Sequence, residues 1–150
     1  MALIQGRYGK RGATAINPCE AGVTASIVYE LDMAAQAVNT TDVVELGPLP
    51  AKAQLIGATV IGASVGAITA TVGLLTGEAG DPLSTRALEG GASNFITAGS
   101  INDTETAATR AACLGVAPSD THRGVGCTIS ANTAAGAGKK IRVVLQYFYP

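Results

Sequence analysis

The sequence has few large aromatic side chains: it contains no tryptophan, two phenylalanines and four tyrosines. Its hydrophobic residues, 47% of the chain, are dominated by alanine, and 19 of the 150 residues are glycine. Small side chains bury little area, and buried apolar area contributes only about 25 cal/mol per Å². A single copy is therefore expected to be modestly stable, and docking onto a partner would supply further burial. The lack of tryptophan also argues against a site that stacks sugars on aromatic rings.

Charge is scarce as well. Charged residues make up 14% of the chain and the net charge is −1, which argues against a general nucleic-acid binder because such proteins cluster lysine and arginine against phosphates. Three cysteines, Cys19, Cys113 and Cys127, cannot all pair within one chain and show no CxxC spacing. They predict no disulfide framework and favour a reducing compartment. The first residues, MALIQGRYGKRG, show no secretory signal.

Residues 53–77 carry no charge, and a run of this length is long enough to span a bilayer as a helix. The run is rich in Gly, Thr, Val and Ile, however, and repeated glycine disfavours a helix by about 1 kcal/mol each. Strands broken by glycine turns are the favoured interpretation. A membrane-associated protein is kept as an alternative.

Alternating hydrophobicity predicts an all-β chain. In residues 26–34 Ile27, Tyr29, Leu31 and Met33 share one face, which is typical of a half-buried strand. Further strands are expected in the segments 42–46, 53–64 (one or two strands), 68–77, 94–100, 124–132 and 139–150. About eight short strands with frequent turns favour a sandwich, jelly roll or small barrel.

Three connections carry specific expectations. Pro48 and Pro50 are expected to interrupt the ladder after residue 46, because proline has no backbone donor. Residues 102–116 predict either the one helix, capped by Asn102 or Asp103, or a loop that runs into a strand around residues 108–114. Residues 133–140, TAAGAGKK, are expected to form a hairpin turn between the last two strands.

No residue pattern predicts catalysis. His122, the only histidine, lies beside Ser119 and Asp120, but adjacent residues seldom form a triad. Cys113, His122 and Cys127 lack the close spacing of zinc ligands. The acidic pairs 30/32 and 78/81 lack an apolar cleft that would raise one pKa, and no phosphate-binding glycine motif is present. The expectation is a protein that is not an enzyme and has no metal, cofactor or small-molecule substrate.

Two ends of the chain are candidate binding segments. Residues 1–25 are expected to form an extended arm that leads into a single domain, residues 26–150. Within the arm Arg7, Tyr8, Lys10 and Arg11 are candidates to order on an acidic neighbour. The last strand is apolar on both faces and ends in Tyr147, Phe148 and Tyr149, which are candidates for an interface.

The phrases ELGPLPAKAQLIGATV and Gly80-Asp81-Pro82, with the closing segment CTISANTAAGAGKKIRVVLQYFY, resemble the capsid decoration (cement) proteins of tailed bacteriophages. The resemblance covers roughly residues 26–149 and lies mainly in Leu46, Pro48, Pro50 and Ala51 and in the Gly-Asp-Pro loop. It implies a jelly-roll-like β-sandwich that forms a homodimer or homotrimer.

On this resemblance the protein is made in the host bacterial cytoplasm and sits on the outer surface of the capsid, in the virion. There it bridges subunits of the major capsid protein, with no nucleic acid or membrane as partner. The alternative is another structural protein of the phage virion, such as a head-fibre base, tail-completion or tail-tip component, with the same β-sandwich fold.

Overall fold

The computed structural model describes residues 3–5, 23–82 and 86–150. About half of these residues lie in strands, with one short α-helix and one 3-10 turn among them. The elements are β1 (Leu3–Gln5), β2 (Ala25–Asp32), β3 (Val43–Leu49), β4 (Gln54–Ala63), β5 (Thr69–Leu74), η2 (Gly91–Ser93), β6 (Asn94–Ser100), β7 (Glu105–Ala107), α1 (Arg110–Gly115), β8 (Arg123–Ile129) and β9 (Lys140–Phe148).

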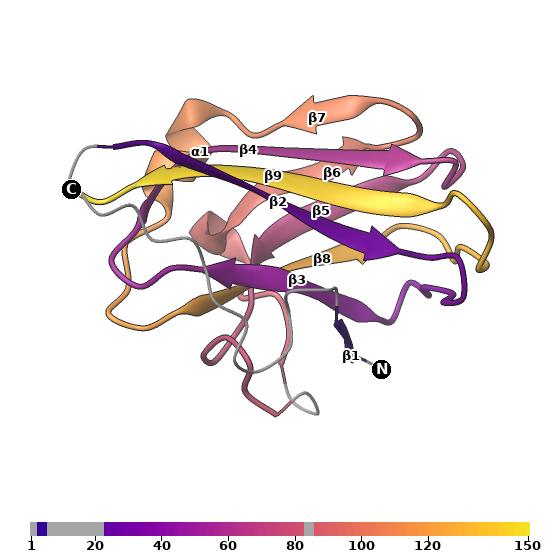
Figure 1. Cartoon of the computed structure of the whole chain (residues 1–150), viewed down its shortest axis with the longest axis horizontal. Helices are drawn as coiled ribbons and strands as arrows, with labels where there is room; N and C mark the ends of the chain where they lie inside the picture. The colour runs from indigo at the N-terminus through magenta and orange to yellow at the C-terminus, as the bar shows by residue number, and fades with distance from the viewer. Residues whose placement is uncertain (1–2, 6–22, 83–85) are drawn as a thin grey trace.

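The strands form two packed sheets, which confirms the predicted β-sandwich. One sheet has the order β2-β9-β4-β7 and the other the order β1-β3-β8-β5-β6, and the two lie one in front of the other in Figure 1. Within them β2 pairs with β9, β3 with β8, β4 with β7 and β5 with β6, all antiparallel. This nested pairing is a single antiparallel ribbon folded over on itself, which is the jelly-roll arrangement.

The core lies between the sheets and is filled by the inward face of each strand. The predicted alternation in β2 is confirmed, since Tyr29 and Leu31 are buried while Val28 and Asp32 are exposed. In β9 the inward residues Ile141, Val143, Leu145 and Tyr147 are 0% exposed. The period of two in the sequence therefore distinguishes core from surface correctly on both strands.

The predicted interruption at Pro48 is wrong. β3 runs to Leu49, with Pro48 opposite Gly124 of β8 and a bulge between Glu45 and Gly47. β1 pairs with β3 only at residues 43–45, so among the described residues Pro48 has a strand on one side, where proline is tolerated. Pro50 follows the strand and lies outside it.

The predicted hairpin between the last two strands is also wrong. β8 and β9 belong to different sheets, so residues 130–139 cross from one layer to the other. The Val38 and Thr133 backbones bond to each other reciprocally, at 3.0 and 2.8 Å, and tie this crossing to the β2–β3 connection. Strong turn signals marked the end of both strands but carried no information about which strands pair.

Residues 102–116 contain the predicted helix, and the alternative strand around residues 108–114 is wrong, because α1 occupies Arg110–Gly115. A short strand, β7, comes first, and α1 follows it. The helix is capped by Thr109, whose side chain accepts a hydrogen bond from the backbone N–H of Ala112 at 3.1 Å. The predicted caps are too early in the chain. Asp103 instead accepts a bond from the N–H of Ser64 at 3.0 Å, and Asn102 forms a bridge with Gly62.

Residues 53–77, the uncharged run, contain the long strand β4 and the strand β5. No helix within the described residues has the length and hydropathy needed to cross a membrane. The first strand, β1, belongs to the segment predicted to be an extended arm, and it pairs in parallel with β3.

Candidate interaction surfaces

The outer face of the β2-β9-β4-β7 sheet is the first candidate surface. Its outward side chains form three adjacent rows, defined by the pairing register. The polar row is Ser26, Gln146 and Gly57. The middle row is Val28, Val144, Thr59 and Ala107. The charged row is Glu30, Arg142, Ile61 and Glu105. Val28, in the middle row, is 51% exposed and is one of the large hydrophobic residues that the chain leaves open to solvent.

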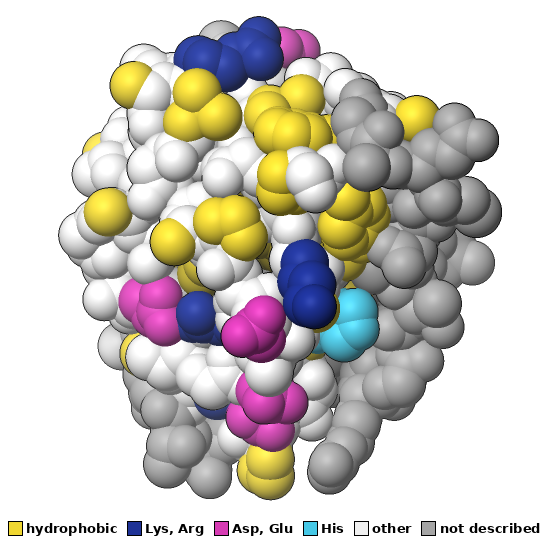
Figure 2. Space-filling model, turned by 90° about the vertical axis from the view of Figure 1, so that its left-hand side faces the viewer, with side chains coloured by type: hydrophobic (Ala, Val, Ile, Leu, Met, Phe, Trp, Pro, Cys, Tyr) yellow, Lys and Arg dark blue, Asp and Glu magenta, His cyan; other side chains and the backbone are white. Residues whose placement is uncertain are grey.

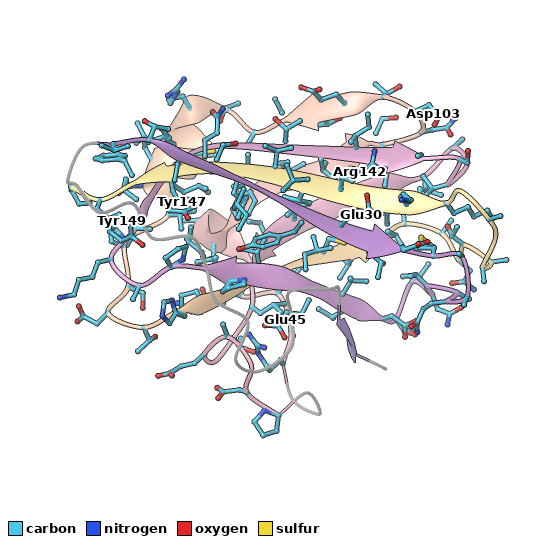
Figure 3. The ribbon with its side chains drawn as sticks, in the orientation of Figure 1. Glu30, Glu45, Asp103, Arg142, Tyr147 and Tyr149 are labelled. Atoms are coloured by element: carbon cyan, nitrogen blue, oxygen red, sulfur yellow. The ribbon has the colours of Figure 1, made fainter. Side chains whose placement is uncertain are left out.

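An ion cluster borders this face. Glu30 accepts from Lys140 Nζ at 2.9 Å and from Arg142 Nε at 2.5 Å, and Figure 3 shows Glu30 and Arg142 on neighbouring strands. The hydrogen bond from Lys140 and then that from Arg142 lower the pKa of the Glu30 carboxyl. Three partly exposed charges fix one another and hold β2 to β9 at this point.

A hollow of about 190 Å³ opens on the same face between β4, β7 and α1. Its floor and walls are small or apolar residues of β4 and β7, including Gly57, Thr59 and Ala107, and Arg110 and Gln146 also line it. The hollow is open because Gly57, Ala58 and Ala107 on its lining have small side chains or none. The hollow can take an aliphatic side chain, with an acidic group beside Arg110.

Part of the outer face of the other sheet, around Glu45 and Gly124, is covered by residues 75–82 and 86–90. Arg86 is 2% exposed and donates through Nη1 to Glu45 Oε1 at 2.6 Å and through Nε to the Thr76 carbonyl at 2.9 Å. Glu45, on β3, is labelled just below that strand in Figure 3. The guanidinium lies directly over Gly124, where an added Cβ would come within 2.3 Å of Arg86 Nη2. If either side chain of this buried ion pair were removed, the other would be left as an uncompensated buried charge, which is strongly destabilising.

A second arginine holds the same segment. Arg123 Nη2 donates to the Leu75 carbonyl at 2.9 Å and pairs with the Glu89 carboxylate. Asp81 Oδ2 accepts from the Glu78 N–H at 2.8 Å, and the Ala79 N–H donates to the His122 carbonyl at 2.8 Å. The loop that contains Gly80-Asp81-Pro82 is thereby fixed against the sheet.

The end of the sandwich that carries the C-terminus is the second candidate surface. Figure 2 shows hydrophobic side chains on this end interspersed with charged ones. Tyr147 is 0% exposed, its ring packed edge-on against Tyr149 with centroids 6.2 Å apart, whereas Phe148 and Tyr149 are half-buried. Burial raises the pKa of both tyrosines. Of the three predicted aromatic contacts, Tyr147 belongs to the core, and the other two reach the surface.

The other predicted site residues, Arg7, Tyr8, Lys10 and Arg11, lie outside the described residues, and so does Cys19.

His122 is exposed, and its Nδ1 accepts from the Ala51 N–H at 3.1 Å. Cys113 and Cys127 are buried, in α1 and β8, and burial raises the pKa of the Cys127 thiol to about 12. Within the described part of the chain, no three histidine, cysteine or carboxylate side chains come together as metal ligands.

The surface rows and the hollow were missed by sequence reasoning. The exposed positions of β2 and β9 were visible as alternation, but their neighbours on β4 and β7 depend on the sheet order. The one available signal was the group of small residues within 57–63, Gly57, Ala58, Gly62 and Ala63. Small side chains on the solvent-facing side of a strand leave space above the sheet.

The fold has counterparts among solved structures. A chain from the capsid of Ralstonia phage GP4 superposes with a TM-score of 0.80 over 99% of this chain and 98% of its own length, at 24% identity. A chain of the cyanophage Pam1 capsid asymmetric unit matches with a TM-score of 0.51 over 93% and 95%, at 21% identity. No protein-family model and no curated protein matches the sequence. This chain therefore shares its β-sandwich fold with chains of phage capsids.

Proposed function

We propose that this chain is a structural, non-catalytic protein of a bacteriophage virion that decorates the outer surface of the capsid. The observation that carries the proposal is the match to the GP4 capsid chain, which extends over almost the whole of both chains. The GP4 chain is therefore of nearly the same extent as this one, with little beyond the sandwich. A small sandwich of this kind suits a protein added to a shell.

The proposed mechanism is stabilisation by mass action. A protein that binds the mature, expanded shell but not its precursor lowers the free energy of the expanded state. Each contact is modest, but many copies that bridge neighbouring subunits of the major capsid protein resist the pressure of packaged DNA together. No nucleic acid, membrane or small-molecule ligand is needed for this role.

The C-terminal end of the sandwich is the proposed contact with the shell. It presents the half-buried Phe148 and Tyr149 and, from α1, Leu114, which is 51% exposed. Aromatic and apolar groups surrounded by polar ones are typical of protein interfaces. The basic residues of the arm, Arg7, Lys10 and Arg11, with Tyr8, remain proposed contacts to acidic patches on capsid subunits.

The test is location and copy number in purified virions of the phage that encodes the chain. We expect the protein at a stoichiometry comparable with the major capsid protein, measured by quantitative mass spectrometry. Virions that lack the gene should be less resistant to heat, and added purified protein should restore that resistance. Absence from the virion refutes the proposal.

The second candidate is a head-fibre base, tail-completion or tail-tip component with the same fold. It predicts only a few copies per particle, on the tail or at one vertex. Immunogold labelling separates the two, because a decoration protein labels the whole head. Leu114→Glu should weaken rebinding to the head of gene-deleted virions if the C-terminal end is the contact.

A further inference from the structure

We infer that the outer face of the β2-β9-β4-β7 sheet is the interface of a symmetric homodimer. The two-fold axis runs across the strands along the middle row. This inference concerns the isolated protein and does not depend on a role in a capsid. It starts from an asymmetry of the sandwich: residues 75–82 and 86–90 lie over the outer face of one sheet around Glu45 and Gly124, whereas the other sheet presents exposed Val28 and an open hollow.

The face is large enough for a dimer. Its three long strands have 8, 10 and 9 residues. At a strand spacing of about 4.8 Å and a rise of about 3.3 Å per residue, four strands cover roughly 500 Å² per copy. The flat area of the two faces together is about 1,000 Å², and protruding side chains add to it. This reaches the lower bound for a specific interface.

The proposed axis makes the face complementary to itself. Rotation by 180° about the middle row sets each strand over its own copy in the reverse direction. Val28 and Val144 of one copy then contact Val28 and Val144 of the second copy, so the two middle rows cover each other. The charged row faces the polar row, which sets Glu30 and Arg142 against Ser26 and Gln146 of the second copy and brings no like charges together.

The same rotation fills the hollow. Two residues along β4 from the axis, Ile61 of one copy lies over Gly57 of the other, which lines the hollow. The Gln146 amide of that copy must swing aside, because its Oε1 lies 2.7 Å from where a Cβ of Gly57 would be. An engineered cavity of about 150 Å³ accommodates benzene, so a hollow of about 190 Å³ has room for the smaller side chain of isoleucine. On the neighbouring strand, Glu105 of one copy comes to the position of Arg110 of the other. The dimer therefore has two matched contacts of each kind.

The other two-fold arrangement, with the axis parallel to the strands, is disfavoured. It sets β2 over β7 and keeps each row over itself. Glu30 then lies over Glu105 of the second copy, and Ile61 no longer reaches the hollow. Like charges placed opposite one another across an interface oppose association.

The first experiment is sedimentation velocity of the full chain over a wide dilution series. We expect a monomer–dimer equilibrium for the wild type. Val28→Glu places two carboxylates at the axis and should raise the dissociation constant at least about 100-fold. Val23→Glu is the matched control, because this valine is 46% exposed and lies before β2, outside the three rows. Far-ultraviolet circular dichroism checks that both variants are folded.

The second experiment tests the axis by charge reversal. Glu105→Arg and Arg110→Glu should each weaken the dimer, and the double variant should restore it, because the two charges change places across the interface. Both residues are exposed, so neither substitution buries a charge in the isolated copy.

Three outcomes overturn the inference: a wild type that stays monomeric, a dimer that survives Val28→Glu, or a double charge variant no better than either single variant. A Val28→Glu protein that binds virions poorly although the wild type is monomeric would assign the face to the shell instead. Loss of the dimer with intact copy number in virions would leave the proposed function standing.

Discussion

The contact between Gly47 and Tyr29 fixes how the two sheets close on each other at β2 and β3. A Cβ on Gly47 would lie 2.4 Å from Cε1 of the Tyr29 ring and 2.6 Å from Cδ1 and Cζ. Carbon atoms pack at about 3.5–4.0 Å, so ring or strand must move by about 1 Å. The ring has no room to move, because Tyr29 is 1% exposed and its hydroxyl donates to the Pro48 carbonyl at 2.6 Å.

Gly47→Ala should therefore lower the free energy of unfolding by about 2–4 kcal/mol. Overpacking accounts for about 1–3 kcal/mol, and strain on the hydroxyl bond for about 1 kcal/mol more. Urea denaturation followed by circular dichroism measures the loss. Gly115→Ala is the matched control: a Cβ added to this residue of α1 would meet nothing within 4 Å, so that variant should be neutral or more stable by up to about 1 kcal/mol.

A double-variant cycle tests the cause. If the ring is the obstacle, Gly47→Ala should cost much less when Tyr29→Ala has already removed it, with a coupling of at least about 1 kcal/mol. Equal costs in both backgrounds would refute steric exclusion by Tyr29 and point to the backbone of β3 instead.

Three further outcomes follow from charge and burial. Arg86→Met should cost about 3–5 kcal/mol in urea denaturation, because it removes the guanidinium that faces the buried Glu45 carboxylate; a loss below about 1 kcal/mol would contradict this. Glu30→Gln should cost at most about 1 kcal/mol at neutral pH. Because the ion cluster lowers the Glu30 pKa, this contribution is present above the unfolded carboxyl pKa of about 4.3 and is lost as pH falls through the lower folded value. The unfolding temperatures of the wild type and Glu30→Gln should converge in acid. A difference that widens at low pH would show that the ion cluster is not the source of the effect. Burial raises the pKa of the Cys113 thiol and raises that of Cys127 to about 12, so neither should be alkylated at pH 8 until the chain unfolds, as peptide mapping by mass spectrometry would show.

The sequence predicted the content of the fold well where local pattern decides it. Alternation over residues 26–33 and 141–147 identified two strands and the face of each that enters the core, and glycine-rich and polar turns separated the others. These signals are local, because the direction of a side chain from a strand depends only on its position modulo two.

Strand pairing was not readable in this way. The strong turn at residues 133–140 looked like a hairpin, yet β9 pairs with β2 and β4, and β8 with β3 and β5. Turn residues report where the chain bends but not which layer it enters next.

The sequence by itself determined most of the strands between residues 26 and 150, the inward faces of the first and last of them, the shortage of aromatics and charge, and the two chain ends as candidate contacts. Only the tertiary structure decided that Val28, Thr59, Ala107 and Val144 form one row, that Ile61 and the hollow lie on either side of it, and that Arg86 reaches Glu45. These residues are far apart in the chain and are brought together by the sheet order. The nested ribbon sets that order through many long-range backbone bonds, which no local pattern of side chains encodes.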